Sequence, residues 1–413
     1  MFLSLIECRR KYTQILTQRR RLTNTRLLGV RFYFCVMSYR PKTKLGILGG
    51  GQLGRMLIQE TINIDVDVHV LDPDPDAPCR DISHSFTAGS FKDFDTVLAF
   101  GKGMDVVTIE IEHVNVDALE ELEKQGIKVY PQPNVIRLIQ DKGAQKEFYT
   151  LHGIPTSDYR LIGENEAENH TDFFPVFQKL RKGGYDGKGV QSLKSIDDIS
   201  KAFSEPSVLE KAVDLEKELS VIVARNASGE VKTFPTVELE FNPFANLVEF
   251  LFSPANVSDE VEKKSQEIAR TIAEKLEIVG LLAVELFLDI EGNVLVNEIA
   301  PRPHNSGHQS IEGNYTSQFM QHVRAILNIS LGNTEIVKPS VMVNLLGEDG
   351  FTGPAKYEGL EDVLAMKGVN VHLYGKALTK PFRKMGHVTV ISETLEEAIS
   401  TAKQVQKTLK VKA

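Results

Sequence analysis

Short apolar runs alternate with a helical pattern in the first third of the chain. The apolar segment Leu45–Leu48 is followed by a glycine turn and then by a helix-like stretch over Gln52–Thr61. Further apolar runs cover Val66–Leu71 and Val106–Ile109. Strand, helix and strand in this order are typical of a parallel α/β sheet. The pattern predicts a Rossmann-like domain over residues 41–133.

Strand patterns dominate the middle of the chain. A helix is predicted over Lys142–Leu151, with Asp141 as its N-cap and Gly153 and Pro155 beyond its end. The other predicted elements are the strands Pro175–Leu180, Ser207–Val213 and Glu218–Ala224, the amphipathic helix Ser258–Leu276 and the hairpin Leu282–Ala300. These elements predict a second domain over residues 134–335. Short strands and a terminal helix from Leu395 to Leu409 predict a small α+β domain over residues 336–413.

The composition is that of an ordinary globular protein. Of the 413 residues, 42% are hydrophobic and 25% are charged, and no apolar run approaches the length of about 20 residues that spans a bilayer. The three cysteines have neither metal-ligand spacing nor a disulfide framework, which indicates a reducing compartment. We therefore expect a cytoplasmic protein with no membrane partner.

The charge is divided unequally along the chain. Residues 1–40 hold nine basic side chains and one acidic side chain, whereas the rest of the chain is acidic and brings the net charge to −8. An acidic body argues against nucleic-acid binding, which needs a basic surface. The basic segment can be a transit peptide, an interaction tail or an extension outside the working protein. We favour the last interpretation, because Met37 stands just before the first strand pattern.

A glycine turn follows the first strand. Gly49–Gly54 has the spacing G-x-G-x-x-G, and Asp72 ends the second strand, where a dinucleotide fold places its ribose-binding acid. A nicotinamide-dependent oxidoreductase is therefore one hypothesis. The motif alone is weak, because any tight turn from a strand to a helix can contain these glycines.

A second glycine-rich segment lies between two predicted strands. Residues 183–189 hold four glycines, which the interior of a helix or strand would not tolerate. Successive backbone amides of such a loop can bind phosphate oxygens, and Lys179 and Lys188 add positive charge. The spacing is not that of a Walker loop, and the plain alternative is a surface hairpin without a ligand.

Two acids face each other if the predicted hairpin has an even loop. With a loop of two or four residues centred between Glu291 and Gly292, Glu285 lies directly opposite Glu298. Like charges in this position destabilise a sheet unless a cation neutralises them, and magnesium is the natural candidate. Asn297 and Asn305 could add oxygen ligands. An odd loop would separate the two carboxylates.

An irregular polar segment follows the hairpin. Residues 301–308 read Pro-Arg-Pro-His-Asn-Ser-Gly-His, and Arg302 and His304 could hold a small anion. Taken alone, the segment is better interpreted as a capped loop with ordinary hydrogen bonds.

Four motifs in this order resemble one known family. Residues 49–56, 183–189, 297–308 and 384–390 are similar to those of N5-carboxyaminoimidazole ribonucleotide synthetases, and the resemblance runs from about residue 44 to the C-terminus. It implies an α/β ATP-grasp fold with an N-terminal Rossmann-like parallel-sheet domain, a central ATP-grasp domain and a small C-terminal α+β domain. It also implies carboxylation of 5-aminoimidazole ribonucleotide through carboxyphosphate in purine biosynthesis. ATP and bicarbonate are consumed, ADP and phosphate are released, and the cofactors are ATP and Mg²⁺, with Mn²⁺ as an alternative ion.

The resemblance also assigns roles to residues. The implied ATP site comprises Lys142, Lys179, the loop residues Gly184, Tyr185, Asp186, Gly187, Lys188 and Gly189, the adenine-reading edge Glu210, Lys211, Ala212 and Val213, the ribose-binding Glu218, and Asn297 and Glu298. The implied ribonucleotide site comprises Gln52, Leu53, Glu110, Lys376 and Arg383. Glu285 and Glu298 would hold the metal, and the implied catalytic residues are Tyr185, Asp186, Arg302, His304 and Lys376.

One position departs from the family pattern, since Phe241 stands where a histidine is expected. The absence of a fused mutase domain implies a separate mutase that acts on the product, and a homodimer is the family expectation. A sister ATP-grasp enzyme, formate-dependent glycinamide ribonucleotide transformylase, is the nearest alternative. The oxidoreductase and a catalytically silent ATP-binding protein are more distant ones.

Overall fold

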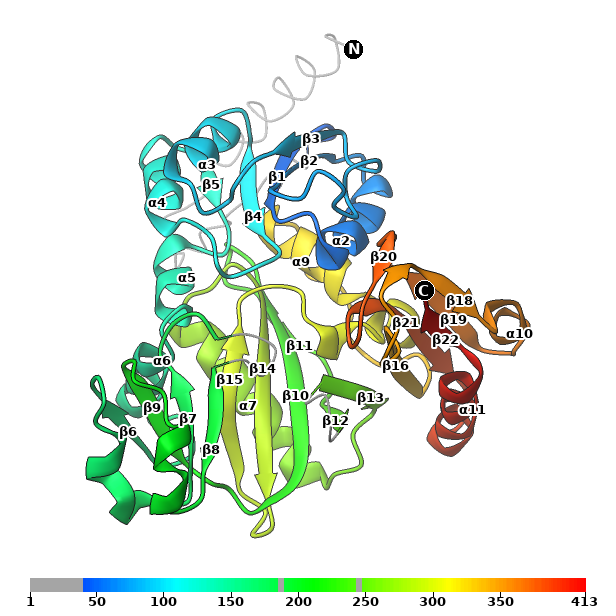
Figure 1. The fold of residues 1–413 in the computed structure, drawn as a ribbon. Helices are drawn as coiled ribbons and strands as arrows, with labels where there is room; N and C mark the ends of the chain where they lie inside the picture. The colour runs from blue at the N-terminus through cyan, green and yellow to red at the C-terminus, as the bar shows by residue number, and fades with distance from the viewer. Residues whose placement is uncertain (1–39, 185–188, 243–246) are drawn as a thin grey trace, which may run out of the picture. The chain divides into compact units, whose positions relative to one another are not determined.

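The computed structural model describes residues 40–184, 189–242 and 247–413 of the chain. The first part of this range forms a five-stranded parallel sheet (Figure 1). Its strands in spatial order are β3 (Ser85–Ala88), β2 (Asp67–Asp72), β1 (Lys44–Leu48), β4 (Val106–Ile109) and β5 (Lys128–Val129). The predicted Rossmann-like arrangement of strand, helix and strand is confirmed.

Helices cover both faces of this sheet because side chains of the central strand alternate between them. Leu45 and Ile47 pack with α2 (Gln52–Ile62) and α9 (Gln318–Ile326) on one face. Leu48 packs on the other face with α3 (Phe94–Gly101) and α4 (Val116–Lys124). The helix α9 comes from a part of the chain far from the sheet in sequence, yet its Phe319, Val323 and Ile326 belong to the same core cluster as β1.

A four-stranded antiparallel sheet follows in sequence. Its spatial order is β6 (Tyr159–Ile162), β9 (Ser207–Lys211), β7 (Val176–Leu180) and β8 (Val190–Leu193). The glycine-rich loop connects the antiparallel pair β7 and β8, as the sequence predicts. Gly183 and Gly189 at its two ends have positive φ angles of 84° and 80°, which glycine adopts without strain.

The largest sheet has nine strands. Its main order is β15 (Val294–Ala300), β14 (Gly280–Asp289), β10 (Leu215–Arg225), β12 (Val237–Asn242), β13 (Leu247–Ser253), β16 (Ser340–Leu346), β21 (Lys384–Ile391) and β19 (Val369–Leu373), with β11 (Val231–Thr233) paired to β10. The strands of the C-terminal segment join those of the preceding segment edge to edge through β13 and β16. The domain boundaries drawn from the sequence therefore remain predictions, since one sheet runs across residue 336.

Short elements complete the described chain. The remaining helices are α5 (Pro133–Ile139), α6 (Lys142–Leu151), α7 (Asp259–Lys275), α8 (Ser310–Gly313), α10 (Leu360–Leu364) and α11 (Leu395–Thr408), with 3-10 turns η1 (Ala167–Phe173), η2 (Ile196–Lys201) and η3 (Asn305–Gly307). Two small strand pairs are β17 (Gly353–Pro354) with β20 (Leu378–Thr379) and β18 (Lys356–Glu358) with β22 (Lys410–Lys412). No helix within the described ranges is long and apolar enough to cross a membrane.

The long helix α7 shows why these residues fold as they do. Ser258 caps it by accepting a hydrogen bond from the Val261 N–H, and acidic side chains occupy its first turn, where the helix dipole favours negative charge. Its buried Ile268 and Ile272 pack against β10 and β14 in the largest core cluster. The amphipathic helix predicted over Ser258–Leu276 is thus confirmed to within one residue at each end.

A buried histidine ties α9 to two sheets. The N–H of Leu281 in β14 donates to His322 Nδ1 (3.2 Å), so the other ring nitrogen carries the proton and donates to Thr108 Oγ1 in β4 (2.9 Å). His322 is fully buried, and burial lowers its pKa to about 3. The neutral ring is therefore the form that the fold requires.

Replacing His322 by glutamine should change how stability depends on pH. In the unfolded wild type, His322 takes up a proton below about pH 6.5. In the folded protein, the same ring stays neutral down to about pH 3. Stability is therefore lost as pH falls, by up to about 1.4 kcal/mol per pH unit for this one group. Melting curves should show His322→Gln less stable than the wild type at pH 7.5, with a smaller gap at pH 4.5.

Thr108→Val is the matched control, because it removes the hydrogen bond and keeps the histidine. Its stability deficit should stay nearly constant over the same pH range. A constant deficit for His322→Gln as well would contradict the assignment of a neutral buried ring.

Candidate active site

Two carboxylates lie opposite each other on neighbouring strands, as predicted. Glu285 in β14 pairs with Glu298 in β15. The expected even loop is wrong. The Asp289 N–H donates to the Asn293 carbonyl, so the loop between these residues has an odd length. The strand residues next to the turn are therefore shifted by one position from the expected register. A β-bulge opposite the Glu285–Leu286 bond leaves Asn297 as an extra residue in β15 and so restores the expected register. The bulge therefore brings the two acids together in spite of the odd loop.

A basic side chain approaches each acid. Lys142 at the start of α6 forms an ion pair with Glu298, and His304 Nε2 lies 3.5 Å from Glu285 Oε1. The Lys142 ammonium lowers the pKa of Glu298, whereas burial and the charge of Glu298 raise the pKa of Glu285. The pair thus holds one firmly ionised carboxylate and one that favours a proton or a cation.

The donor set suits Mg²⁺ bound together with phosphate. Within the described residues no group of three or more His, Cys, Asp or Glu side chains is placed to enclose a metal. Mg²⁺ is commonly held by one or two carboxylates and by the phosphates of a nucleotide. Two adjacent carboxylates, one with a raised pKa, fit that pattern.

A buried ion cluster lies beside this pair. The Glu210 carboxylate accepts hydrogen bonds from Lys179 Nζ (3.0 Å) and Ser157 Oγ (3.2 Å), and Lys146 Nζ lies 3.2 Å from the same oxygen. Lys179 also donates to Asn297 Oδ1 (2.8 Å). These contacts bring three of the predicted ATP residues together, namely Lys179, Glu210 and Asn297. The side chain of Glu210 belongs to the cluster, so only its backbone can read a base.

The predicted adenine edge begins where β9 ends. The Lys211 N–H donates to the Asp158 carbonyl and the Ala212 N–H to the Pro175 carbonyl. Among the described residues, the Val213 N–H donates to no other group, so it remains available to a ring nitrogen. The Lys211 side chain points away from the ion cluster and donates to the Phe173 and Phe174 carbonyls.

Glu218 shares a face of the large sheet with the two acids. It lies on β10, two residues before Ser220, which pairs with Glu285. Burial raises the pKa of Glu218 to about 7. Gly184 and Gly189 flank the part of the glycine-rich loop that carries Tyr185, Asp186, Gly187 and Lys188, and these four predicted residues lie outside the described ranges.

The segment after β15 is a polar loop held by side-chain hydrogen bonds. Gln318 of α9 accepts from the His304 N–H (2.9 Å) and donates to the His304 carbonyl (2.7 Å). His304 Nδ1 bonds to Ser306 Oγ (2.8 Å), which in turn bonds to Ser220 Oγ (2.7 Å). This chain fixes the imidazole beside Glu285. Arg302 pairs with Glu112 (2.8 Å), which extends from the loop after β4.

Asn305 is bonded to the C-terminal strands. Its side-chain amide forms two reciprocal hydrogen bonds of 2.9 Å with that of Asn344 in β16. The amide thus joins the loop to the C-terminal strands, and the expectation that Asn305 could add an oxygen ligand stays a prediction.

The first glycine turn is closed by carboxylates. The Gly51 and Gly54 N–H groups donate to the two oxygens of Glu110 (2.6 and 2.7 Å), and the Gly50 N–H donates to Asp72 (2.6 Å). A Cβ at Gly51 would lie 2.6 Å from Glu110, so glycine is needed there for the close approach. Amides that already bind carboxylates cannot also bind a pyrophosphate. This geometry disfavours the oxidoreductase hypothesis.

The other predicted substrate residues lie around this turn and the C-terminal loop. Gln52 starts α2, whereas the Leu53 side chain is 8% exposed and packs in the core, which leaves only its backbone for a ligand. Between β19 and β21, Lys376 donates to the carbonyl of Lys384 at the start of β21 (2.7 Å), and Arg383 donates to the carbonyl of Leu378 in β20 (2.7 Å). Arg55 of α2 reaches this loop, since a Cβ on Gly375 would lie 3.3 Å from Arg55 Nη1.

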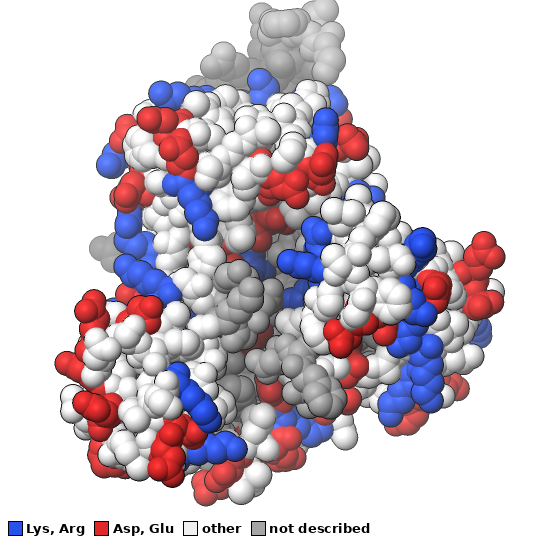
Figure 2. Space-filling model, in the orientation of Figure 1, with Lys and Arg blue, Asp and Glu red and all other residues white. Residues whose placement is uncertain are grey.

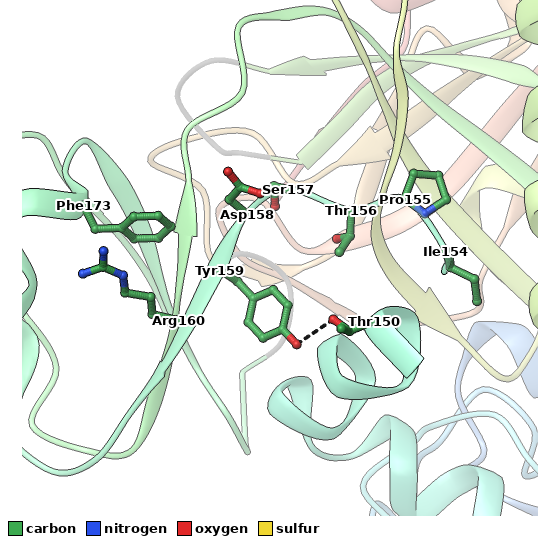
Figure 3. A pocket seen from close by; sticks show the side chains of 9 residues that line it. All are labelled: Thr150, Ile154, Pro155, Thr156, Ser157, Asp158, Tyr159, Arg160 and Phe173. Carbon is green, nitrogen blue, oxygen red and sulfur yellow. Dashed lines mark hydrogen bonds between the residues drawn. The ribbon is translucent and has the colours of Figure 1, made fainter. Parts of the chain in front are cut away.

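The surface is hollowed near the middle of the face shown in Figure 2, with acidic and basic side chains around the hollow. A small cavity is lined by predicted residues Lys142, Lys179, Glu210, Asn297 and Glu298, and also by Gln145, Lys146 and Tyr149. A larger cavity of about 440 Å³ lies beside the edge strand β6 (Figure 3). None of the predicted site residues lines the larger cavity, and Thr150 and Tyr159 bridge part of it by a hydrogen bond of 2.8 Å.

Sequence reasoning missed three residues of this region: Lys146, Glu112 and Arg55. A signal existed for Lys146, which follows Lys142 by four residues and so lies on the same face of α6. Phe241, which replaces the expected histidine, is partly buried on β12 and packs against a core cluster.

Comparisons with known proteins agree with this geometry. Three family descriptions match in succession: a ribonucleotide synthetase preATP-grasp domain (residues 42–140), an ATP-grasp domain (147–319) and a phosphoribosylaminoimidazole carboxylase C-terminal domain (340–401). The chain is 38% identical to the chloroplastic phosphoribosylaminoimidazole carboxylase of Vigna aconitifolia, over 85% of this chain and 64% of that protein. It is 37% identical to the N5-carboxyaminoimidazole ribonucleotide synthase of Synechococcus elongatus, over 85% of this chain and 90% of that protein.

Solved structures give the same result. The N5-carboxyaminoimidazole ribonucleotide synthetase of Thermotoga maritima superposes with a TM-score of 0.83 at 43% identity, covering 90% of this chain and 99% of that one. An Aspergillus clavatus enzyme in complex with ADP and 5-aminoimidazole ribonucleotide has a TM-score of 0.81 at 36% identity, covering 89% and 98%. The ATP-grasp fold predicted from the sequence is thereby confirmed. The chain belongs to the N5-carboxyaminoimidazole ribonucleotide synthase family of ATP-grasp enzymes.

Proposed function

We propose that the protein carboxylates 5-aminoimidazole ribonucleotide at the expense of ATP and bicarbonate, giving N5-carboxyaminoimidazole ribonucleotide, ADP and phosphate. The observation that carries the proposal is the pairing of Glu285 with Glu298 between two basic groups, Lys142 and His304. A site of this kind suits a transferred phosphoryl group, because cations neutralise the charge that develops on it. The chain spans 90% of the Synechococcus relative, which is named as an N5-carboxyaminoimidazole ribonucleotide synthase.

The chain's own residues would divide the work as follows. Lys142 and Lys179 would bind the phosphates of ATP, and the Val213 N–H with the backbone before it would bind adenine. Arg302 and His304 would hold bicarbonate, whose oxygen attacks the γ-phosphate to give carboxyphosphate and ADP. The exocyclic amine of the ribonucleotide then takes the carboxyl group and phosphate leaves. Mg²⁺, held by Glu285 and Glu298, would supply charge neutralisation at the phosphates.

The ribonucleotide would lie between the glycine turn and the C-terminal loop. Lys376 and Arg383 are both on the loop between β19 and β21, and Arg55 brings that loop against α2. Gln52 and the backbone of Leu53 would contact the ribose side, next to Glu110. The solved Aspergillus relative holds ADP and 5-aminoimidazole ribonucleotide together, which supports two adjacent sites.

Three further expectations from the sequence belong to the proposal. The choice of Mg²⁺ over Mn²⁺, a homodimer and a separate mutase that receives the product remain predictions. A cytoplasmic location also remains a prediction. The Vigna relative is named as a chloroplastic protein.

Phosphate release from ATP tests the proposal directly. With magnesium present, release should require bicarbonate and should rise when 5-aminoimidazole ribonucleotide is added. Release that instead needs formate and glycinamide ribonucleotide would assign the protein to the transformylase. No release with either pair of substrates would favour the silent ATP-binding protein.

Glu298→Gln should lower ATP turnover by at least about 100-fold, because it removes one of the two charges that would hold the metal at the phosphates. The substitution keeps the size of the side chain, so thermal melting should show a folded protein. Glu291→Gln, at the exposed turn of the same hairpin, should turn over ATP like the wild type. Normal turnover in Glu298→Gln would remove Glu298 from the metal site.

Lys376→Met should raise KM for the ribonucleotide about tenfold or more, because a charge-assisted contact to its phosphate is lost. KM for ATP should stay within about twofold, because Lys376 bonds to the Lys384 carbonyl and to none of the ATP residues that the structure describes. Lys380→Met removes an exposed charge from the same loop and serves as the control. An equal rise in both KM values would argue for a general loss of structure.

A further inference from the structure

Lys146 is an unusual lysine because it is almost completely enclosed. Its side chain is 2% exposed, and that of its partner Glu210 is 4% exposed. Its Nζ lies 3.2 Å from Glu210 Oε2 and donates to Thr156 Oγ1 (2.6 Å), which donates onward to the Val296 carbonyl (2.7 Å). A charge is buried at high cost unless it is paired and hydrogen-bonded, and Lys146 meets both conditions.

The pairing is shared rather than exclusive. Glu210 Oε2 is contacted by Lys146, by Lys179 (3.0 Å) and by the Ser157 hydroxyl (3.2 Å). One carboxylate between two ammonium groups leaves the trio with a net charge of +1. With Glu210 and Lys179 alone, the charge of Lys179 would be cancelled.

The two lysines differ in exposure, because 11% of the Lys179 side chain is exposed and only 2% of the Lys146 side chain. Lys179 also reaches Asn297 (2.8 Å), the residue before Glu298, and both lysines line the small cavity with Lys142 and Glu298. Lys146 contacts Glu210 and Thr156 and has almost no surface for a ligand. It can act on a bound phosphate only through its field and through Glu210.

We infer that Lys146 is a positioning residue for the nucleotide, which shares Glu210 with Lys179 and so leaves Lys179 with positive charge to offer to the phosphates. This inference rests on the ATP site of the proposed function and adds a residue to it. A compensating charge that is already in place costs no reorganisation when the polyphosphate binds.

The inference has a consequence for pH. Burial lowers the pKa of Lys146 to about 8 against the opposing attraction of Glu210. The charged groups that face it are Glu210 from β9, Lys179 from β7 and Lys142 from its own helix, with Glu298 of β15 on the same cavity and the Tyr149 ring 6.0 Å from its Nζ. Raising the pH through 8 removes the charge of Lys146, so nucleotide affinity should fall over this range.

Calorimetric titration of the full chain with ADP and magnesium, at pH 7.5 and pH 9, tests this. Lys146→Met should bind ADP about tenfold more weakly at pH 7.5, as expected for the loss of one nearby charge in a partly shielded site. Lys146→Arg keeps the charge at both pH values, so it should bind like the wild type at pH 7.5 and should lose the weakening at pH 9. Thr156→Val removes the neutral hydrogen bond to Lys146 without changing the charge, and should keep the wild-type affinity within about twofold.

Wild-type affinity in a folded Lys146→Met, or the same weakening at pH 9 in Lys146→Arg as in the wild type, would overturn the inference. If circular dichroism shows that Lys146→Met does not fold, the comparison of Lys146→Arg with the wild type still decides. Direct titration also separates this inference from the proposed function. A wild type that binds ADP as described but carboxylates nothing would refute the function and leave the role of Lys146 intact.

Discussion

The site is organised by the repulsion between two carboxylates that the large sheet holds side by side. The pairing of β14 with β15 fixes Glu285 opposite Glu298, and neither backbone can move away without breaking the ladder. Surrounding groups must therefore supply positive charge, a proton or hydrogen bonds. Lys142 comes from the first turn of α6, whose start is fixed by the Asp141 cap, and His304 is held in place through Ser306 and Gln318. The helix, the loop and the hairpin thus meet at these two carboxylates.

Carboxylates have a different task at the glycine turn. There Glu110 and Asp72 accept hydrogen bonds from the turn amides, which would otherwise attract a phosphate. The same letters G-x-G-x-x-G therefore describe an anion-binding turn in one protein and an internally satisfied turn in another. What distinguishes them is an acid at the end of a neighbouring parallel strand, here Glu110 directly after β4. Because these turn amides are already hydrogen-bonded, a substrate would contact the turn through the polar side chains at its rim.

Much of the fold could be predicted because its signals are local. Asp141 caps α6, an amphipathic stripe marks α7, and each is visible within a few residues. The pairing of Glu285 with Glu298 was predicted from an even loop alone. It depends in fact on a bulge at Asn297, which no turn motif in the sequence indicates. The union of β13 with β16 joins residues about ninety positions apart, such as Phe250 and Val343, and leaves no local trace. The burial of Lys146 was missed because a lone lysine is normally a surface residue, and only its spacing from Lys142 indicated otherwise.

The position of α9 has a consequence for how the chain acquires its structure during synthesis. The first sheet is complete in sequence by residue 129, but one of its faces is covered by Phe319, Val323 and Ile326, which emerge from the ribosome nearly two hundred residues later. Until then Leu45, Ile47 and the apolar side of α2 have no partner from that helix. The segment matched by the preATP-grasp family therefore completes one of its core clusters only with a helix from outside its own bounds. A nascent chain of this protein would carry an exposed apolar surface that chaperones recognise until the middle of the chain has been made.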